Sequence, residues 1–168
     1  MMVVGSMTLD VLAWALLAAY VVHLLDETMM NGGFVHWVSA NFWPGYNQRM
    51  FFWFNAGAVV AIAAGNVLFD VFGGHSVVLP LFWIFGFALH GVTVHVFWTV
   101  RQRDYSPGLI TSVLYWIIAY LVVRYGFADG RISAADFWTG AVAGMVLLGG
   151  FLTIGPTVLF PRMGPGGR

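Results

Sequence analysis

The chain has 168 residues, of which 60% are hydrophobic, 8% charged and 17% aromatic, and its formal net charge is zero. A soluble domain carries about 25% charged residues, so this chain cannot cover a water-facing surface and must have lipid as its solvent. The neutral charge gives no reason to expect nucleic acid as a partner, and the absence of cysteine excludes disulfides, thiolate metal sites and cysteine nucleophiles. The composition therefore predicts an all-α membrane protein.

Five apolar segments are long enough to cross roughly 30 Å of hydrocarbon. They run from about residue 9 to 25, 50 to 72, 77 to 100, 107 to 125 and 136 to 160. Ser106 is expected to cap the fourth helix, with Pro107 in its first position, and Ser133 with Asp136 forms a capping box before the fifth. Short connections predict antiparallel neighbours, and hence one bundle of five transmembrane helices over residues 1–161, followed by a flexible tail at 162–168.

The stretch at residues 31–48, NGGFVHWVSANFWPGYNQ, is too short and too polar to span a membrane, yet it is rich in aromatic residues. Aromatic residues gather at the membrane–water interface, so this stretch is expected to lie at headgroup level between the first two helices. His36 within it is expected to be a headgroup-level residue rather than a ligand. On the opposite side, His75 is expected to take part in ordinary loop chemistry with Asp70.

The placement of the arginines indicates the orientation of the bundle. One side holds Arg49, Arg101, Arg103, Arg162 and Arg168, and the other holds Arg124 and Arg131. Positively charged loops tend to face the cytoplasm. The chain is therefore expected in a bacterial inner membrane with its N-terminus outside and its C-terminus inside.

The fifth apolar segment carries glycines at positions 140, 144, 149, 150 and 155. Small residues let helices approach closely inside a membrane. This segment is therefore expected to pack against other helices of the chain, or against a second copy or a larger membrane complex.

The first helix ends with three ionisable residues, His23, Asp26 and Glu27, in the sequence HLLDE. His23 and Glu27 lie on one face of an α-helix, with Asp26 about 60° to the other side of His23. A carboxylate at the centre of a bilayer costs about 2.5–3.5 kcal/mol, and such residues normally face a bundle interior or water. The three side chains can point into one space between helices. The alternative is a cluster at the helix end, already in the interfacial region.

Two further helices place a polar side chain at the same level as the HLLDE group. Asn55 follows Arg49 by six residues and His95 precedes Arg101 by six, so each lies about 9 Å inside the boundary at 1.5 Å per residue. Independent polar residues would have no reason to agree in depth. Asn55 is therefore a candidate catalytic residue, either as a weak ligand or as a donor that orients a carboxylate.

His90 lies deeper on the same helix as His95. Its offset of five residues turns it about 140° away from His95 in an α-helix. Only one of the two histidines is then expected to face the common site, unless the helix bends near Gly86 or Gly91.

These residue types suit a metal ion. Two imidazoles with one or two carboxylates form a common ligand set for zinc or non-haem iron that leaves a position open. The sequence predicts that His23, His95 and Glu27 bind one divalent metal, with His90 as a further candidate ligand and Asp26 as a further ligand or the general base for a bound water. Two alternatives remain: a metal-free His–Glu acid–base pair, and a structural polar network that ties three helices together.

The chain resembles the HXXEE family of small integral membrane proteins. Three blocks carry the resemblance over roughly residues 20–115: HLLDE followed by NGGFVHW, then FFWFNAG, then a histidine about ten residues before YSPGLITSVL. Asp26 stands where the family motif has Glu, which keeps a carboxylate but shortens its reach, and His90 stands where a polar amide is expected. The family has no established activity, so the resemblance supports the candidate site residues His23, Asp26, Glu27, Asn55 and His95 more than any reaction.

These observations lead to the hypothesis of a metal-dependent membrane enzyme whose site opens at the cytoplasmic face. The interfacial segment and the YSPG corner would form the entry for a lipid-like or isoprenoid-like substrate. Hydrolysis and iron-dependent oxidation both fit the ligand set, and hydrolysis is preferred because no site for a redox partner is visible. The rival hypothesis is a non-catalytic membrane subunit or a protein that binds a pigment, haem or lipid, in which the polar cluster is structural.

Overall fold

The structure, a computed structural model, describes residues 9–29, 33–41, 43–127 and 130–154. The expected tail at residues 162–168 lies outside this part of the chain. The described residues contain helices and connecting turns but no strand. Five of the helical stretches are long and apolar enough to cross a membrane, which confirms the predicted all-α bundle of five spans: Leu9–Met29, Gln48–Phe72, Gly74–Gln102, Leu109–Gly126 and Ala134–Phe151.

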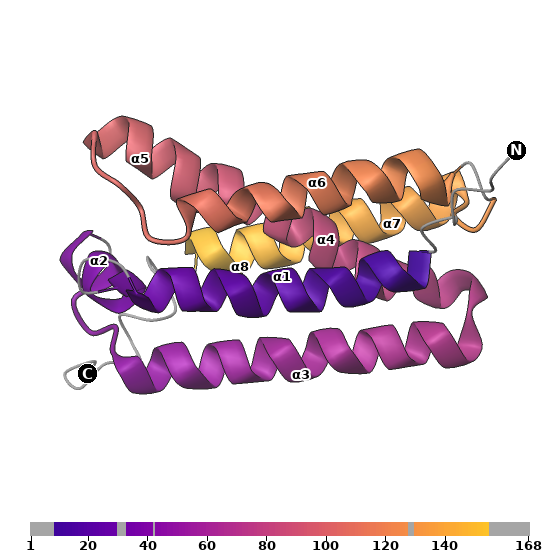
Figure 1. The fold of residues 1–168 in the computed structure, drawn as a ribbon, viewed down its shortest axis with the longest axis horizontal. Helices are drawn as coiled ribbons and strands as arrows, with labels where there is room; N and C mark the ends of the chain where they lie inside the picture. The colour runs from indigo at the N-terminus through magenta and orange to yellow at the C-terminus, as the bar shows by residue number, and fades with distance from the viewer. Residues whose placement is uncertain (1–8, 30–32, 42, 128–129, 155–168) are drawn as a thin grey trace, which may run out of the picture.

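The helices run roughly side by side along the long axis of the molecule, with α2 and α5 at one end (Figure 1). In chain order they are α1 (Leu9–Met29), α2 (Gly33–Asn41), α3 (Gln48–Phe72), η1 (Gly74–Val77), α4 (Val78–His90), η2 (Gly91–Val96), α5 (Phe97–Gln102), α6 (Leu109–Gly126), α7 (Ala134–Ala143), η3 (Gly144–Leu148) and α8 (Gly149–Ile154). The segment expected between the first two spans contains the short helix α2. Two spans are interrupted by π-helical turns, η2 in the third and η3 in the fifth.

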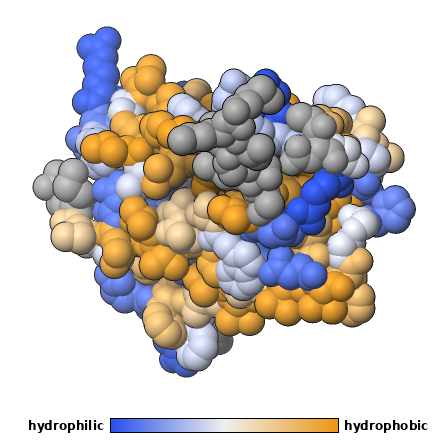
Figure 2. Space-filling view, turned by 45° about the vertical axis from the view of Figure 1, so that its right-hand side comes forward, coloured by the Kyte–Doolittle hydropathy of each residue, from blue (hydrophilic) through white to orange (hydrophobic). Residues whose placement is uncertain are grey.

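Helix α4 lies in the middle of the bundle and packs against α3, α6, α7 and η3. Its residues Leu81, Ile84 and Phe87 belong to a buried cluster that also includes side chains of α1, α3 and α6. A polar contact joins two of these helices, because the amide of Asn66 on α3 donates to the carbonyl of Ala13 on α1 at 2.9 Å. Outside this core the surface is apolar over much of the face seen in Figure 2, as a lipid solvent requires.

Two glycines of the last span, Gly140 and Gly144, lie against α4, whereas a Cβ on Gly150 would meet nothing within 4 Å and Gly155 lies outside the described residues. A Cβ on Gly140 would lie 2.5 Å from Leu81 Cβ, and a Cβ on Gly144 would lie 2.2 Å from the carbonyl oxygen of Phe82. These glycines therefore let α7 and η3 approach the backbone of α4, as expected of small residues in membranes. Association with a second copy through this span stays a prediction.

The two predicted helix caps have different outcomes. Ser133 accepts a hydrogen bond from the backbone N–H of Asp136, so it caps α7 as predicted. The prediction that Ser106 caps the fourth helix is wrong, because α6 begins at Leu109 and its N-cap is Gly108, with φ of 92°. The Ser106 hydroxyl instead contacts a histidine of the polar cluster described below.

The end of the bundle far from α2 is held by polar contacts of its own. Arg131 donates to Asp10 at 2.7 and 3.0 Å. His75 pairs with Asp136 at 2.7 Å, whereas Asp70 accepts from the indole of Trp14. The sequence had suggested an interaction between His75 and Asp70. This expectation is wrong, because His75 pairs with Asp136 instead.

Replacing Gly144 with alanine tests the close approach of the last span to α4. Gly144→Ala is expected to lower the free energy of unfolding by about 1–3 kcal/mol, the usual cost of overpacking, because the added Cβ meets the Phe82 carbonyl. Gly150→Ala is the matched control, since a Cβ there meets nothing within 4 Å. Thermal unfolding of both variants in detergent measures the difference. Equal midpoints would contradict the packing described here.

Candidate metal centre

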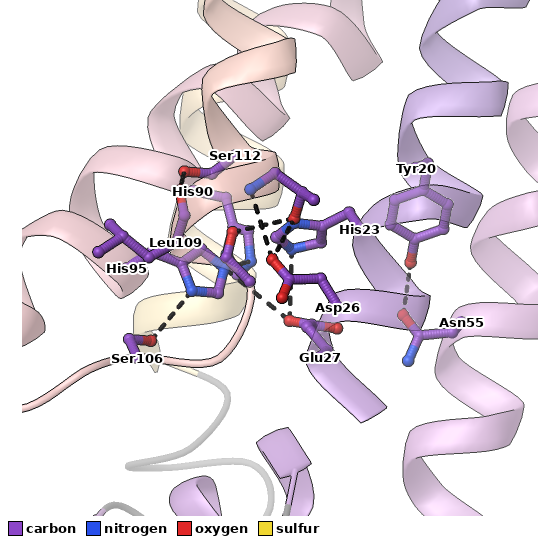
Figure 3. Close-up of polar contacts among 12 residues, drawn as sticks. Tyr20, His23, Asp26, Glu27, Asn55, His90, His95, Ser106, Leu109 and Ser112 are labelled. Carbon is purple, nitrogen blue, oxygen red and sulfur yellow. Dashed lines mark hydrogen bonds and ion pairs between the residues drawn. The ribbon is translucent and has the colours of Figure 1, made fainter. Parts of the chain in front are cut away.

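Four buried side chains from two of the spans meet near one end of the bundle (Figure 3). His23 and Glu27 come from α1, His90 from α4 and His95 from η2, and each can offer a ligand atom that lies within 4.8 Å of all the others. His95 Nε2 lies 3.2 Å from His90 Nε2, and Glu27 Oε1 lies 3.4 Å from His23 Nε2 and 3.8 Å from His95 Nε2. In a tetrahedral zinc site with bonds of 2.0–2.1 Å, ligand atoms are about 3.3 Å apart. The cluster is therefore close to the size of a metal coordination shell.

The π-helical turn η2 explains how His90 and His95 can both face this cluster. In an α-helix an offset of five residues would turn them apart, which led to the expectation that only one faces the site. Backbone hydrogen bonds in a π-helix run from residue i to i+5, and the N–H of Phe97 indeed donates to the carbonyl of Val92. This wider turn brings the two rings to a centroid distance of 4.8 Å. A π turn that begins at Gly91, rather than the bend near Gly86 or Gly91 that was given as the exception, thus brings both histidines to the site.

Neighbouring side chains hold the backbone on the N-terminal side of this turn. Trp116 on α6 donates its indole N–H to the carbonyl of Ala88 at 2.9 Å. Thr93 donates its hydroxyl to the carbonyl of Leu89 at 3.0 Å. Such side-chain bonds satisfy carbonyl groups where the regular helical pattern changes. The π turn is therefore a supported part of the structure.

The carboxylate of this cluster is costly to bury without a compensating positive charge. The exposed fraction is 4% for Glu27, 1% for His23 and 0% for His95. An isolated carboxylate in an apolar interior carries a large desolvation penalty unless a positive charge or a metal compensates it. In addition, His23 Nε2 and His90 Nδ1 are buried without a hydrogen-bond partner among the described residues. A bound divalent cation would neutralise the carboxylate and use the free nitrogen of His23.

The corner between α5 and α6 lies directly against this cluster. A Cβ on Gly108 would lie 2.6 Å from His23 Cε1, 2.8 Å from His95 Cε1 and 3.0 Å from Glu27 Cγ. Ser106, in the same corner, is buried, and its hydroxyl lies 3.0 Å from His95 Nδ1. Because the Ser106 hydroxyl contacts Nδ1 of His95, the other ring nitrogen, Nε2, faces the cluster. The YSPG corner therefore forms one wall of the site.

Asp26 is placed outside the cluster. Its Oδ2 accepts from the hydroxyl of Thr111 at 2.9 Å and more weakly from the Thr111 backbone N–H at 3.4 Å. Thr111 lies in the first turn of α6, where backbone N–H groups have no partner inside the helix. The carboxylate therefore supports the start of α6, and it is not one of the four groups that come together around the candidate ion.

Asn55 also points elsewhere than expected. Its Oδ1 accepts from the Tyr20 hydroxyl at 2.5 Å, and its amide nitrogen donates to the carbonyl of Phe51. Figure 3 shows the Tyr20–Asn55 pair to one side of the cluster, joining α1 to α3. The structure thus gives Asn55 no contact with the carboxylates of the HLLDE group, although it lines the same cavity as His23 and Glu27.

A cavity of about 210 Å³ opens beside the cluster. His23, Glu27 and His90 line one part of it, and the rest is largely aromatic. The aromatic side chains include Phe34, Trp37, Trp43, Trp83, Phe87 and Trp98. Burial raises the pKa of the Tyr46 phenol in this wall, with the Glu27 charge as a second cause, so Tyr46 stays neutral. The cavity combines a polar region at the histidines with apolar walls.

Several residues of this site are not apparent from the sequence alone. Gly108 and Thr111 lie in the YSPGLITSVL block and Tyr115 follows it on α6, but nothing in the sequence shows that these residues contact the HLLDE group. The ring of Tyr115 lies 5.1 Å from that of His23, and its buried hydroxyl has no hydrogen-bond partner among the described residues. Tyr20 could have been identified, because it precedes His23 by three positions and so shares its helix face.

The family model described as a protein of unknown function with HXXEE motif matches residues 14–123. The matched range contains all six residues that the sequence nominated for the site. Comparison with curated proteins and with solved structures finds no match.

Gly108→Ala tests how closely the YSPG corner packs on the cluster. The variant is expected to be less stable than Gly130→Ala, because both positions have a positive φ, at 92° and 67°, but only the Gly108 Cβ meets neighbouring atoms. The strain of a non-glycine residue at such a φ is of order 1–2 kcal/mol in both variants. The additional loss for Gly108→Ala, measured by thermal unfolding in detergent, reports the contact with His23 and His95. Equal losses would contradict it.

Proposed function

The chain belongs to the family of proteins of unknown function with an HXXEE motif, and we propose that it is a metal-dependent membrane enzyme that hydrolyses a hydrophobic, lipid-like substrate. The observation that carries this proposal is the buried group of three imidazoles and one carboxylate at the side of an aromatic cavity. Imidazole and carboxylate ligands suit zinc and iron. The metal would be one divalent ion per chain.

The roles of the four residues follow from their positions. Catalytic zinc sites commonly have three protein ligands and an open position for water, and His23, His90 and His95 can supply three nitrogens. Glu27 lines the cavity. Its Oε1 lies 3.8 Å from His95 Nε2, which is longer than the separation between His90 Nε2 and His95 Nε2. We assign Glu27 as the base that would accept a proton from the attacking water.

A bound divalent ion would lower the pKa of its water to near 7. In hydrolysis, Glu27 would accept a proton from the attacking water, whose oxygen would form a bond to the electrophilic atom of the substrate while the bond from that atom to the leaving group breaks. Glu27 would then pass the proton to the leaving group. The aromatic part of the cavity supports an apolar substrate, because burial of hydrocarbon against such side chains is favourable. Residues Phe34, Trp37 and Val38 of α2 line the cavity, which supports entry of the substrate at the interfacial end of the bundle.

The site end of the bundle is proposed to face the cytoplasm. Among the described residues, Arg49, Arg101 and Arg103 belong to this end, and Arg124 and Arg131 to the other. This distribution favours cytoplasmic exposure of the site end by the positive-inside rule. The same rule gives an N-terminus outside and a C-terminus inside, and the membrane is proposed to be a bacterial inner membrane.

Metal analysis of protein purified in mild detergent tests the proposed centre. We expect about one equivalent of a transition metal in the wild type and a loss of most of it in His23→Ala, His90→Ala and His95→Ala, because each removes one ligand. His36→Ala is the matched control, since His36 is an exposed residue of α2. Glu27→Gln is expected to keep the metal, which would separate a base from a ligand.

Two results would overturn this proposal. One is less than half an equivalent of any transition metal in the wild type after reconstitution with zinc or ferrous iron. The other is an unchanged metal content in His95→Ala with normal thermal unfolding. An absorption band of haem or pigment in the purified protein would favour the non-catalytic ligand-binding alternative.

Single cysteines test the orientation, because the natural chain has none. Asp104→Cys lies at the site end and Ala135→Cys at the opposite end, and both positions are exposed. A membrane-impermeant maleimide added to intact spheroplasts is expected to label Ala135→Cys, and to label Asp104→Cys only after permeabilisation. The opposite pattern would place the site at the outer face.

A further inference from the structure

A chain of two hydrogen bonds connects His23 to Asp26 through Thr111. Thr111 Oγ1 lies 2.9 Å from His23 Nδ1 and 2.9 Å from Asp26 Oδ2. The threonine comes from the first turn of α6, and both partners come from α1. The proposed function makes no use of Asp26 or Thr111, although the first belongs to the HLLDE group and the second to the YSPGLIT block.

The donors and acceptors in this chain can be assigned from chemistry alone. A threonine hydroxyl has one hydrogen to donate and accepts through its oxygen. The hydroxyl has two partners other than His23, the Asp26 carboxylate at 2.9 Å and the Gly108 carbonyl at 3.2 Å. Both groups can accept a hydrogen bond, and neither can donate one. The hydrogen bond to a carboxylate is the stronger of the two. The hydroxyl hydrogen is therefore directed to Asp26, and its oxygen accepts from His23 Nδ1–H.

This assignment determines which nitrogen of His23 is free. A neutral imidazole with its hydrogen on Nδ1 has a bare lone pair on Nε2. His23 Nε2 is the buried atom that has no hydrogen-bond partner and lies 3.4 Å from Glu27 Oε1. The lone pair thus points into the cluster, where a metal would bind.

We propose that Thr111 is a positioning residue that fixes His23 in the Nδ1–H tautomer and so presents Nε2 as a metal ligand, and that Asp26 acts on His23 only through Thr111. The tautomer part depends on the hydrogen bonds alone, whereas the metal part rests on the proposed function. Partners of this kind fix the ring orientation and raise the basicity of a ligating histidine. Asp26 is then neither a ligand nor the base for a bound water.

Asp26 also accepts the backbone N–H of Thr111, so its substitution could act through the stability of α6. Thr111→Val separates the two effects, because valine has nearly the same shape and keeps the backbone N–H but lacks the hydroxyl. Thr111→Ser restores a hydroxyl and serves as the rescue variant. Ser112→Ala is the matched control, since it removes a neighbouring hydroxyl that donates to the Leu109 carbonyl.

The first experiment measures the tautomer in metal-free protein. The chain has five histidines, so ¹⁵N-histidine NMR in detergent micelles at pH 8, assigned with single His variants, can follow each ring. His23 is expected to show a protonated Nδ1 and a bare Nε2 in the wild type, Thr111→Ser and Ser112→Ala. Thr111→Val and Asp26→Asn are expected to shift His23 toward the other tautomer. A wild-type His23 protonated on Nε2 would overturn the proposal, whatever the protein binds.

The second experiment measures zinc affinity by competition with a chelator. Thr111→Val is expected to lower the affinity about 10–100-fold, as is typical for the loss of a partner behind a ligand, while Thr111→Ser and Ser112→Ala stay near the wild-type value. The double variant Asp26→Asn with Thr111→Val should bind as weakly as Thr111→Val alone, because Asp26 acts through the hydroxyl. Additive losses would show direct action of Asp26 and overturn that part of the proposal.

The two experiments separate the proposals. A wild type that binds no zinc but shows the expected tautomer and its loss in Thr111→Val contradicts the proposed function and the role of Thr111 in metal binding, and leaves the tautomer assignment supported. Equal zinc affinity in the wild type and in Thr111→Val contradicts only the positioning role of Thr111.

Discussion

The rest of this site depends on the burial of one carboxylate among three imidazoles in a protein whose solvent is lipid. Glu27 is 4% exposed, so bulk water does little to stabilise its charge, and a positive partner must come from the protein or from an ion. Three neutral imidazoles supply lone pairs but no net positive charge. A divalent cation satisfies both needs at once, since it neutralises the carboxylate and uses the lone pairs. This balance of charge, rather than the presence of histidines, is the main physical argument for a metal.

The backbone is irregular where the four side chains are brought together. The π turn η2 places His95 on the same side as His90, and the left-handed Gly108 lets the corner before α6 approach both His23 and His95. Regular helices with ordinary caps would leave these rings apart or would place a Cβ between them. Irregular backbone at membrane depth is tolerated when it is buried in protein. In these two segments Gly91, His95 and Gly108 are buried, whereas Val92 and Thr93 of η2 are exposed. The second π turn, η3, has no comparable polar group among the described residues and instead packs Gly144 against α4.

The sequence predicts the five spans and the residues of the site better than it predicts their contacts. Span lengths and the common depth of His23 and His95 follow from hydropathy and helical rise, which need no knowledge of packing. The joint orientation of His90 and His95 could not be predicted, because a π turn depends on contacts such as that of Trp116 with the Ala88 carbonyl. Asn55 shows a second limit of the sequence prediction. Its equal depth placed it near the cluster, but depth could not reveal that its amide group bonds with Tyr20. Depth is a one-dimensional signal, whereas contact also needs the rotation of each helix and the identity of its neighbours.

The substitution in the family motif agrees with this division of roles. The HXXEE pattern has two acidic positions, and the chain departs from it at the first, where Asp26 stands, while Glu27 keeps the second. Asp26 lies outside the cluster and contacts Thr111 with its shorter side chain, so the length of a glutamate is not needed there. At position 27 the carboxylate must extend from α1 to within 3.4–3.8 Å of two histidine nitrogens, and a chain shorter by one methylene would reach less far. The two acidic positions of the motif are therefore under different geometric constraints, because the first contacts Thr111 and the second must reach the nitrogens of His23 and His95.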